Sequence, residues 1–228
     1  MTSYLAVAAV VGALIALHEL GHFVAAKACG IPVERFSIGM GPKVFAVERG
    51  GTWYWLSAIP IGGYVLPGLA EPEFRTLPLG KQIVFALGGP AANLAAAYAG
   101  LLVLARFDVV LATTLFGSGL GELGRAVNAL VSGQGELSGV VGIVATGGSM
   151  FGSTLKGLLL FSVSINLNLA VLNLLPLPPL DGGRIVFATL ARLWRPLARL
   201  QTPVTLAGWV FLLALMAYAT VHDVVRIV

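Results

Sequence analysis

The chain has 228 residues, of which 57% are hydrophobic and only 11% are charged. Soluble domains carry about 25% charged residues, so this composition excludes a soluble globular protein and indicates an integral membrane protein. The net charge of +4 does not indicate a nucleic-acid partner, because the basic residues flank apolar segments, as membrane topology requires.

Four apolar segments are long enough to cross a bilayer, which requires about 20 residues. They cover approximately residues 4–28, 82–105, 155–177 and 204–222. Two of them contain polar groups, the first with His18, Glu19 and His22 and the third with Asn166, Asn168 and Asn173. Polar groups at membrane depth persist mainly where they face protein, so we expect these two spans to face each other.

Residues 35–66, between the first two spans, predict a small β structure. The runs 43–48 and 52–58 are strand-like and flank Arg49-Gly50-Gly51, a sequence typical of a hairpin turn. A third short strand is expected over residues 61–66. We therefore predict an all-α polytopic membrane protein with a membrane-associated β-hairpin or small sheet in its first cytoplasmic loop. An alternative is a hairpin that only plugs the protein at the membrane interface.

Residues 107–154, between the second and third spans, are rich in glycine and serine. An amphipathic stretch over residues 120–131 predicts a helix that lies on the outer membrane surface. The segment is too short for a typical inserted domain.

The distribution of positive charge predicts the orientation in the membrane. Ten of the 14 lysines and arginines lie in the loops after the first and third spans. Because cytoplasmic loops carry the excess of basic residues, both of these loops are expected in the cytoplasm. With four spans, both termini are then extracytoplasmic.

The first span contains a metal-binding pattern, His18-Glu19-Leu20-Gly21-His22. Positions i and i+4 share one face of a helix, so both imidazoles can bind one zinc ion. Glu19 is then placed to hold a water molecule rather than the metal. An accidental spacing is the alternative, but only three histidines exist in the chain and two of them are here.

A catalytic zinc site commonly has three protein ligands and a water. Asp181 is the best candidate for the third ligand, because it follows a segment broken by Pro176, Pro178 and Pro179. Irregular backbone at membrane depth is tolerated only against protein or water. His222 competes for this role, but it lies at the far end of the last span and is interpreted as interfacial.

These motifs resemble those of the site-2 proteases, a family of intramembrane zinc metalloproteases, and most closely their RseP-like bacterial branch. The resemblance rests on HELGH at residues 18–22 and on Asn-x-x-Pro-x-Pro-x-Leu-Asp-Gly at residues 173–182. Further likeness covers residues 36–42, 59–65, 88–93 and 138–143. The chain departs from this branch in one respect, because it has no room for a PDZ domain between the second and third spans.

The resemblance implies roles for particular residues. His18, His22 and Asp181 would bind one Zn²⁺, and Glu19 would be the catalytic acid and base. Asn173 and Asn168 would contact the substrate backbone, with hydrogen bonding between helices as the alternative for both. Asn93 is expected to pack the spans together.

The resemblance also implies a single domain over residues 1–228 that hydrolyses peptide bonds within the membrane. Its substrates would be single-span membrane proteins, such as anti-sigma factors or remnant signal peptides. We expect it in the inner membrane of a bacterium, with its active site toward the cytoplasm. The sequence does not indicate the oligomeric state. Two alternatives remain, a metal transporter and a catalytically silent scaffold that retains membrane proteins.

Overall fold

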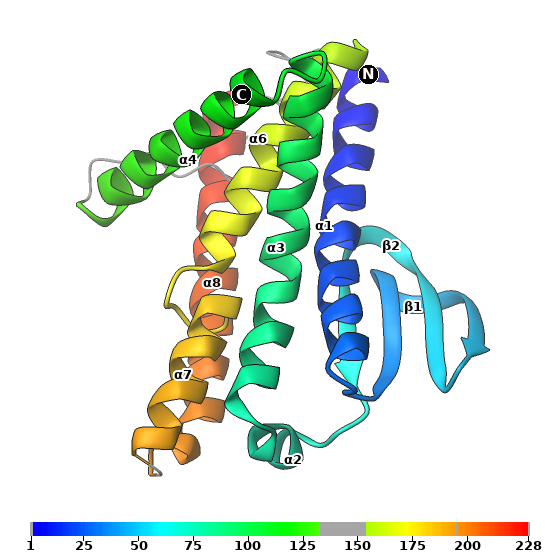
Figure 1. Cartoon of the computed structure of the whole chain (residues 1–228), viewed down its shortest axis with the longest axis vertical. Helices are drawn as coiled ribbons and strands as arrows, with labels where there is room; N and C mark the ends of the chain where they lie inside the picture. Colours follow the sequence, from blue (N-terminus) through cyan, green and yellow to red (C-terminus); the bar gives the residue numbers. More distant parts are fainter. Residues whose placement is uncertain (1, 133–153, 195, 228) are drawn as a thin grey trace.

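A bundle of long apolar helices forms the body of the protein (Figure 1). The computed structural model describes residues 2–132, 154–194 and 196–227. Within these residues four helices are long and apolar enough to cross a membrane. They are α1 (Thr2–Ala28), α3 (Leu79–Leu104), α6 (Leu155–Asn173) and α8 (Leu197–Ile227). The prediction of four spans is therefore confirmed.

The two chain ends lie at the same end of this bundle, as an even number of spans requires (Figure 1). The short helix α2 (Glu71–Thr76), the last turn of α7 (Asp181–Leu193) and the first turn of α8 lie at the opposite end. These are the regions that carry most of the positive charge. The arrangement is compatible with cytoplasmic basic loops, although the side of the membrane stays a prediction.

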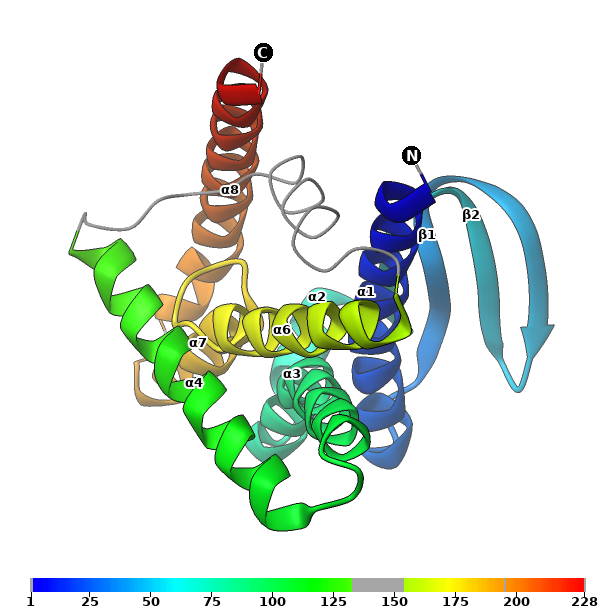
Figure 2. The ribbon, with the colours of Figure 1, turned by 90° about the horizontal axis from the view of Figure 1, so that it is seen from above.

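A small antiparallel sheet lies beside α1 (Figures 1 and 2). It consists of β1 (Val33–Arg49) and β2 (Thr52–Pro67), joined by a tight turn. Gly50 and Gly51 have φ angles of 58° and 70°, the left-handed conformation that a two-residue hairpin turn favours. The predicted hairpin is confirmed at this turn.

Both strands bend, so that residues 35–38 of β1 and 53–56 of β2 have partners on both sides. Ile38 of β1 pairs with Leu56 on one side and with Gly63 on the other. Strand β1 starts at Val33, well before the predicted start at residue 43. Gly39 and Gly41, with φ angles of 84° and 83°, bend the strand between its two runs. These bends interrupt the alternation of side chains that predicts a strand from sequence.

The sheet packs against α1 through aromatic rings. The ring centroids of Phe23 and Phe36 lie 5.3 Å apart, and those of Phe23 and Tyr54 lie 5.8 Å apart. Away from α1 the sheet exposes large apolar side chains, among them Val44 and Phe45. Such a surface favours a sheet that lies in or on the membrane.

Helices α1 and α3 approach each other closely. A methyl group added at Gly21 would collide with the carbonyl of Gly88, and one added at Gly88 would lie 2.5 Å from the carbonyl of Gly21. Two glycines that face each other therefore allow the backbones to touch, as in many membrane helix pairs. This contact brings α3 against the face of α1 that carries the histidines.

Helices α4, α6 and α7 differ from the sequence prediction. Helix α4 (Val109–Val131) begins before the predicted residues 120–131 and packs on α3 and α6 around Ala112 and Leu167. Helix α6 ends at Asn173 because prolines follow, and α7, which was not predicted, begins at Asp181. The motif at residues 138–143 lies outside the described residues.

Candidate metal centre

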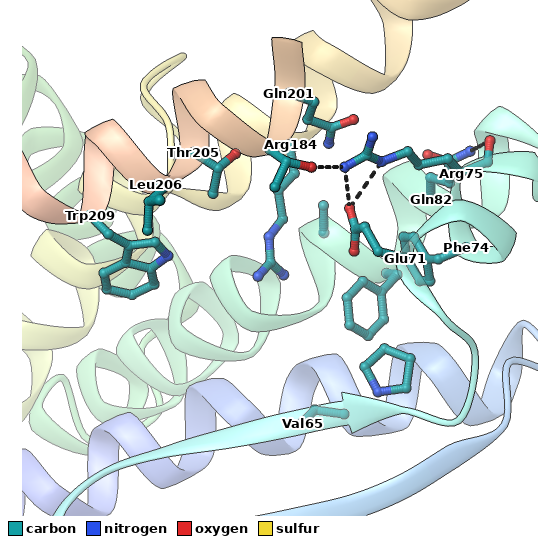
Figure 3. A pocket seen from close by; sticks show the side chains of 14 residues that line it. Val65, Glu71, Phe74, Arg75, Gln82, Arg184, Gln201, Thr205, Leu206 and Trp209 are labelled. Carbon is teal, nitrogen blue, oxygen red and sulfur yellow. Dashed lines mark hydrogen bonds and ion pairs between the residues drawn. The ribbon is translucent and has the colours of Figure 1, made fainter. Parts of the chain in front are cut away.

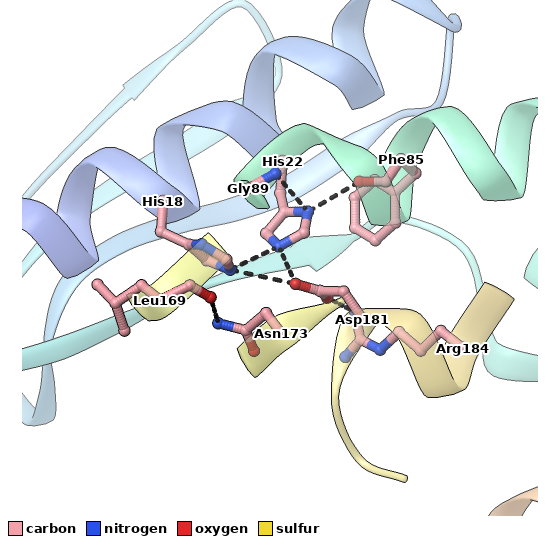
Figure 4. A network of polar contacts seen from close by, with 8 residues as sticks. All are labelled: His18, His22, Phe85, Gly89, Leu169, Asn173, Asp181 and Arg184. Carbon is pink, nitrogen blue, oxygen red and sulfur yellow. Dashed lines mark hydrogen bonds and ion pairs between the residues drawn. The ribbon is translucent and has the colours of Figure 1, made fainter. Parts of the chain in front are cut away.

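Three side chains from α1 and α7 converge on one point (Figure 4). Nε2 of His18 and Nε2 of His22 lie 3.2 Å apart, and each lies 3.2 Å from Oδ2 of Asp181. All three residues are buried. The structure thus brings together the three side chains that were predicted to bind a metal, as an equilateral triangle of one oxygen and two nitrogens.

This triangle fits a metal ion of the size of zinc. Ligands about 2.0 Å from a tetrahedral ion are separated by about 3.3 Å, since zinc–nitrogen distances are about 2.0–2.1 Å. The observed sides of 3.2 Å are close to that separation. The three side chains could therefore hold such an ion, and a catalytic zinc site adds a water or substrate to three protein ligands.

A backbone contact sets the orientation of His22. Its Nδ1 lies 2.8 Å from the carbonyl oxygen of Phe85 in α3. Because a carbonyl only accepts, Nδ1 must carry the proton and donate it, and Nε2 is left with a lone pair toward the centre. Such a partner on the far side of the ring is usual for histidines that bind metals. The amide nitrogen of Gly89 lies 3.3 Å from the same Nδ1, but a protonated Nδ1 has no lone pair to accept a hydrogen bond from this N–H.

Gly89 provides the space for the centre. A methyl group at this position would lie 2.5 Å from Nε2 of His18 and 2.5 Å from Nε2 of His22. The sequence analysis noted the run at residues 88–93 but assigned Gly89 no function. A pair of glycines directly before Pro90 in an apolar helix is the signal that could have found it, because helix interiors disfavour both residue types.

Asp181 owes its position to the break between α6 and α7. Prolines in residues 174–180 end α6, and Asp181 becomes the first residue of α7. Its Oδ2 faces the imidazoles of His18 and His22, and a carboxyl group binds a metal only in its ionised form. Nη1 of Arg184 lies 3.9 Å from its second oxygen.

Glu19 is half-buried beside the centre and lies against β2. A methyl group at Gly63 would lie 3.2 Å from Cγ of Glu19. The glycine thus allows the strand to pass directly alongside the carboxylate-bearing side chain. Glu19 is thus the group that β2 approaches most closely at Gly63.

The two asparagines predicted to contact substrate differ in position. Asn173 ends α6 next to the cluster of His18, His22 and Asp181 (Figure 4), and its amide nitrogen donates to the carbonyl of Leu169 at 2.9 Å. The amide nitrogen of Asn168 donates to the carbonyl of Ser164 at 2.9 Å. No described contact joins Asn168 to the cluster. The side chain of His222 lies outside the described part of the chain.

A cavity of about 400 Å³, lined by both polar and apolar side chains, adjoins the centre. It lies between β2, α2, α3, α7 and α8, and Figure 3 shows Arg184 of α7 and Trp209 of α8 at its wall. Phe85, which holds His22, also lines it. The sequence analysis did not find this cavity, because its lining comes from five separate elements.

The fold and the centre together define a polytopic membrane protein with a buried site of two histidines and one aspartate. The chain belongs to peptidase family M50, whose sequence profile matches residues 6–215. The resemblance to the site-2 proteases is therefore confirmed.

Individual relatives share parts of the chain. Zinc metalloprotease RasP of Shouchella clausii is 46% identical over 83 residues, which are 36% of this chain and 20% of RasP. Regulator of sigma-E protease RseP of Escherichia coli is 39% identical over 93 residues, which are 36% of this chain and 21% of RseP. The Campylobacter jejuni protein Cj1068 is 25% identical over 350 aligned positions, which cover 99% of this chain and 94% of Cj1068.

The chain spans less than half the length of most curated relatives reported, with 33% and 45% for proteins of Fusobacterium nucleatum and Nostoc. The alignment with Cj1068 has more positions than this chain has residues. That relative therefore carries segments with no counterpart here.

Proposed function

We propose that this protein is an intramembrane zinc metalloprotease. It hydrolyses peptide bonds in or near the transmembrane segment of single-span membrane proteins. The observation that carries the proposal is the buried triangle of His18, His22 and Asp181 in a member of peptidase family M50. The zinc metalloprotease names of RasP and of other relatives support zinc as the metal.

The catalytic roles follow from the positions of the side chains. His18, His22 and Asp181 would hold the zinc ion, which would supply a Lewis acid for the scissile carbonyl and for a water molecule. Glu19, one residue after a ligand on α1, accepts the proton of the attacking water and passes it to the leaving amide nitrogen. The carbonyl of Phe85 keeps Nε2 of His22 unprotonated throughout.

The substrate must present an extended backbone, because a helix shields its own carbonyls. We propose that β2 receives this stretch by strand addition, as sheet edges do with peptides. Residues Gly63 to Leu66 pair with β1 along one edge, and no described strand pairs with their other edge. Gly63 lies against Glu19. A peptide added along the other side would pass close to the centre. We propose that Asn173, which lies beside the cluster, holds the substrate backbone, and that Asn168 also contacts this backbone.

The proposed substrates are single-span proteins such as anti-sigma factors or remnant signal peptides. The name of RseP, a regulator of sigma-E, supports this class for a family member.

We further propose a bacterial inner membrane, both termini outside the cytoplasm, the sheet in a cytoplasmic loop and the active site toward the cytoplasmic side. The segment between the second and third spans leaves no room for a PDZ domain, so substrate selection would rest on the membrane domain itself. We propose that this membrane domain is one unit over residues 1–228.

The test compares the purified native chain with its Glu19→Gln variant. Both should contain one zinc per chain, because Glu19 is not a ligand, and only the native chain should cleave a single-span test protein. General acid–base catalysis contributes about 10²–10⁴-fold, so the variant should lose at least about 100-fold in rate. Equal cleavage by both would reject this mechanism. Flux of zinc into liposomes would instead indicate a transporter, and zinc binding without any cleavage a scaffold.

A further inference from the structure

The two histidines of the centre differ on the side of the ring that faces away from the metal. Nδ1 of His22 donates to the carbonyl of Phe85. Nδ1 of His18 is buried and has no hydrogen-bond partner among the residues that the structure describes. A buried polar atom without a partner is costly, and a metal-binding histidine normally has a partner at this nitrogen.

A second unpartnered group lies on α3. Asn93 is fully buried, at 0% exposure, and neither Oδ1 nor Nδ2 has a partner in the described part of the protein. Its side chain therefore brings one acceptor and two donor hydrogens into the apolar bundle, with none of them used. Such an amide is retained in a membrane span mainly where it contacts another polar group.

Helix geometry places these two groups near each other. Phe85, Gly89 and Asn93 are spaced by four residues and so share one face of α3. Phe85 contacts His22, and the Cβ position of Gly89 lies 2.5 Å from Nε2 of His18 and 2.6 Å from Cε1, the ring atom between Nε2 and Nδ1. Asn93 is one turn further along the same face.

The direction of the side chain shortens the remaining gap. In a helix each Cα–Cβ bond tilts toward the N-terminus, so the amide of Asn93 leans over the turn that contains Gly89. Adjacent Cβ positions on this face are about 5–6 Å apart, a span that one amide and one bridging water fill. A buried water with several polar partners is a common component of folded proteins.

We propose that Asn93 is the positioning residue of His18. Its Oδ1 accepts a hydrogen bond from the Nδ1–H of His18, either through one bridging water or directly after a small rotation of the side chain. This contact holds the tautomer in which Nε2 of His18 presents a lone pair to the metal. Asn93 thereby does for His18 what the carbonyl of Phe85 does for His22. The inference rests on the metal centre of the proposed function and adds a residue to it.

The competing interpretation is a purely structural contact with Asn166 on α6. Asn166 is buried, its Nδ2 donates to the carbonyl of Ser162 at 2.9 Å, and its Oδ1 is unpartnered among the described residues. Helices α3 and α6 pack together next to it through Ala97 and Leu167. Asn166 is therefore the matched control, since it is an equally buried asparagine whose loss should spare the centre.

The experiment measures zinc affinity by competition with a chelator, and the melting temperature of the metal-free protein, for four full-length variants. Loss of a group that orients a metal ligand typically lowers metal affinity about 10–100-fold. We expect this loss in Asn93→Leu and in Asn93→Ala, which serves if the larger side chain prevents folding. Asn93→Asp keeps an acceptor at the same place and should bind zinc as tightly as the native chain. Asn166→Leu should keep native zinc affinity even if its melting temperature falls.

Native zinc affinity in both Asn93→Leu and Asn93→Ala would overturn the inference and leave the proposed function intact. An equal loss of affinity in Asn166→Leu would also overturn it, because the effect would then come from helix packing. A native chain that binds no zinc would reject the metal centre itself.

Discussion

Oδ2 of Asp181 lies 3.2 Å from Nε2 of His18, although 163 positions separate the two residues in the chain. The contact joins the first residue of α7 to the middle of α1. Helix α1 supplies two donors from one turn, but it cannot close the centre alone. The break after α6 places the third donor, so the centre depends on the packing of α1, α3, α6 and α7.

Loss of the third ligand should empty the centre. Asp181→Ala removes one of the three donor oxygen and nitrogen atoms, and metal sites need their full ligand set for stable binding. We expect zinc content to fall from one per chain to a small fraction after dialysis, measured by elemental analysis. Asp108→Ala is the control, because Asp108 is exposed and lies outside the cluster. Full zinc content in Asp181→Ala would show that another residue completes the site.

Gly89→Ala should expel the metal without removing any ligand. The added methyl group would lie 2.5 Å from both Nε2 atoms. Overpacking costs about 1–3 kcal/mol, which corresponds to a loss of affinity of about 5- to 150-fold. Zinc titration of the purified variant measures this loss. Gly80→Ala on the same helix meets nothing within 4 Å and should bind zinc normally; equal affinities of the two variants would contradict the close contact.

Gly21→Ala should destabilise the whole bundle. Its methyl group would collide with the carbonyl of Gly88, which belongs to backbone and cannot turn aside. The two helices must separate, so we expect a free-energy cost of about 1–3 kcal/mol and a lower melting temperature in detergent. Gly124→Ala on α4 meets nothing within 4 Å and should melt like the native protein. A native melting temperature for Gly21→Ala would mean that the helices are further apart than described.

Proline on the free side of β2 should impair cleavage and spare zinc binding. Successive N–H groups of a strand point to opposite sides. One of the variants Tyr64→Pro and Val65→Pro therefore removes an N–H that points away from β1, and the other removes an N–H that donates to β1. Both residues lie in the run that pairs with β1 on one side only. The variant with the native melting temperature identifies the outward donor, and its cleavage rate should fall although its zinc content does not. Native cleavage by that variant would exclude strand addition.

The local sequence pattern was sufficient to predict the features that depend only on residues close together in the chain. The four spans follow from apolar runs, and the pairing of His18 with His22 follows from the helical repeat. The turn at Gly50 and Gly51 follows from the need for positive φ angles. Asp181 was also predicted, because prolines interrupt the apolar segment before it.

Other features depended on contacts between distant segments. The extension of β1 back to Val33 requires the second pairing of a bent strand, and α7 requires α3 and α8 as neighbours. The sequence by itself therefore determined which residues have the chemistry to bind a metal and which segments cross the membrane. Only the tertiary structure decided that Gly89 makes room for the centre, that Phe85 orients His22, and that Gly63 brings β2 to Glu19. These roles arise where helix and strand backbones touch, and such distances are set by packing rather than by any local pattern.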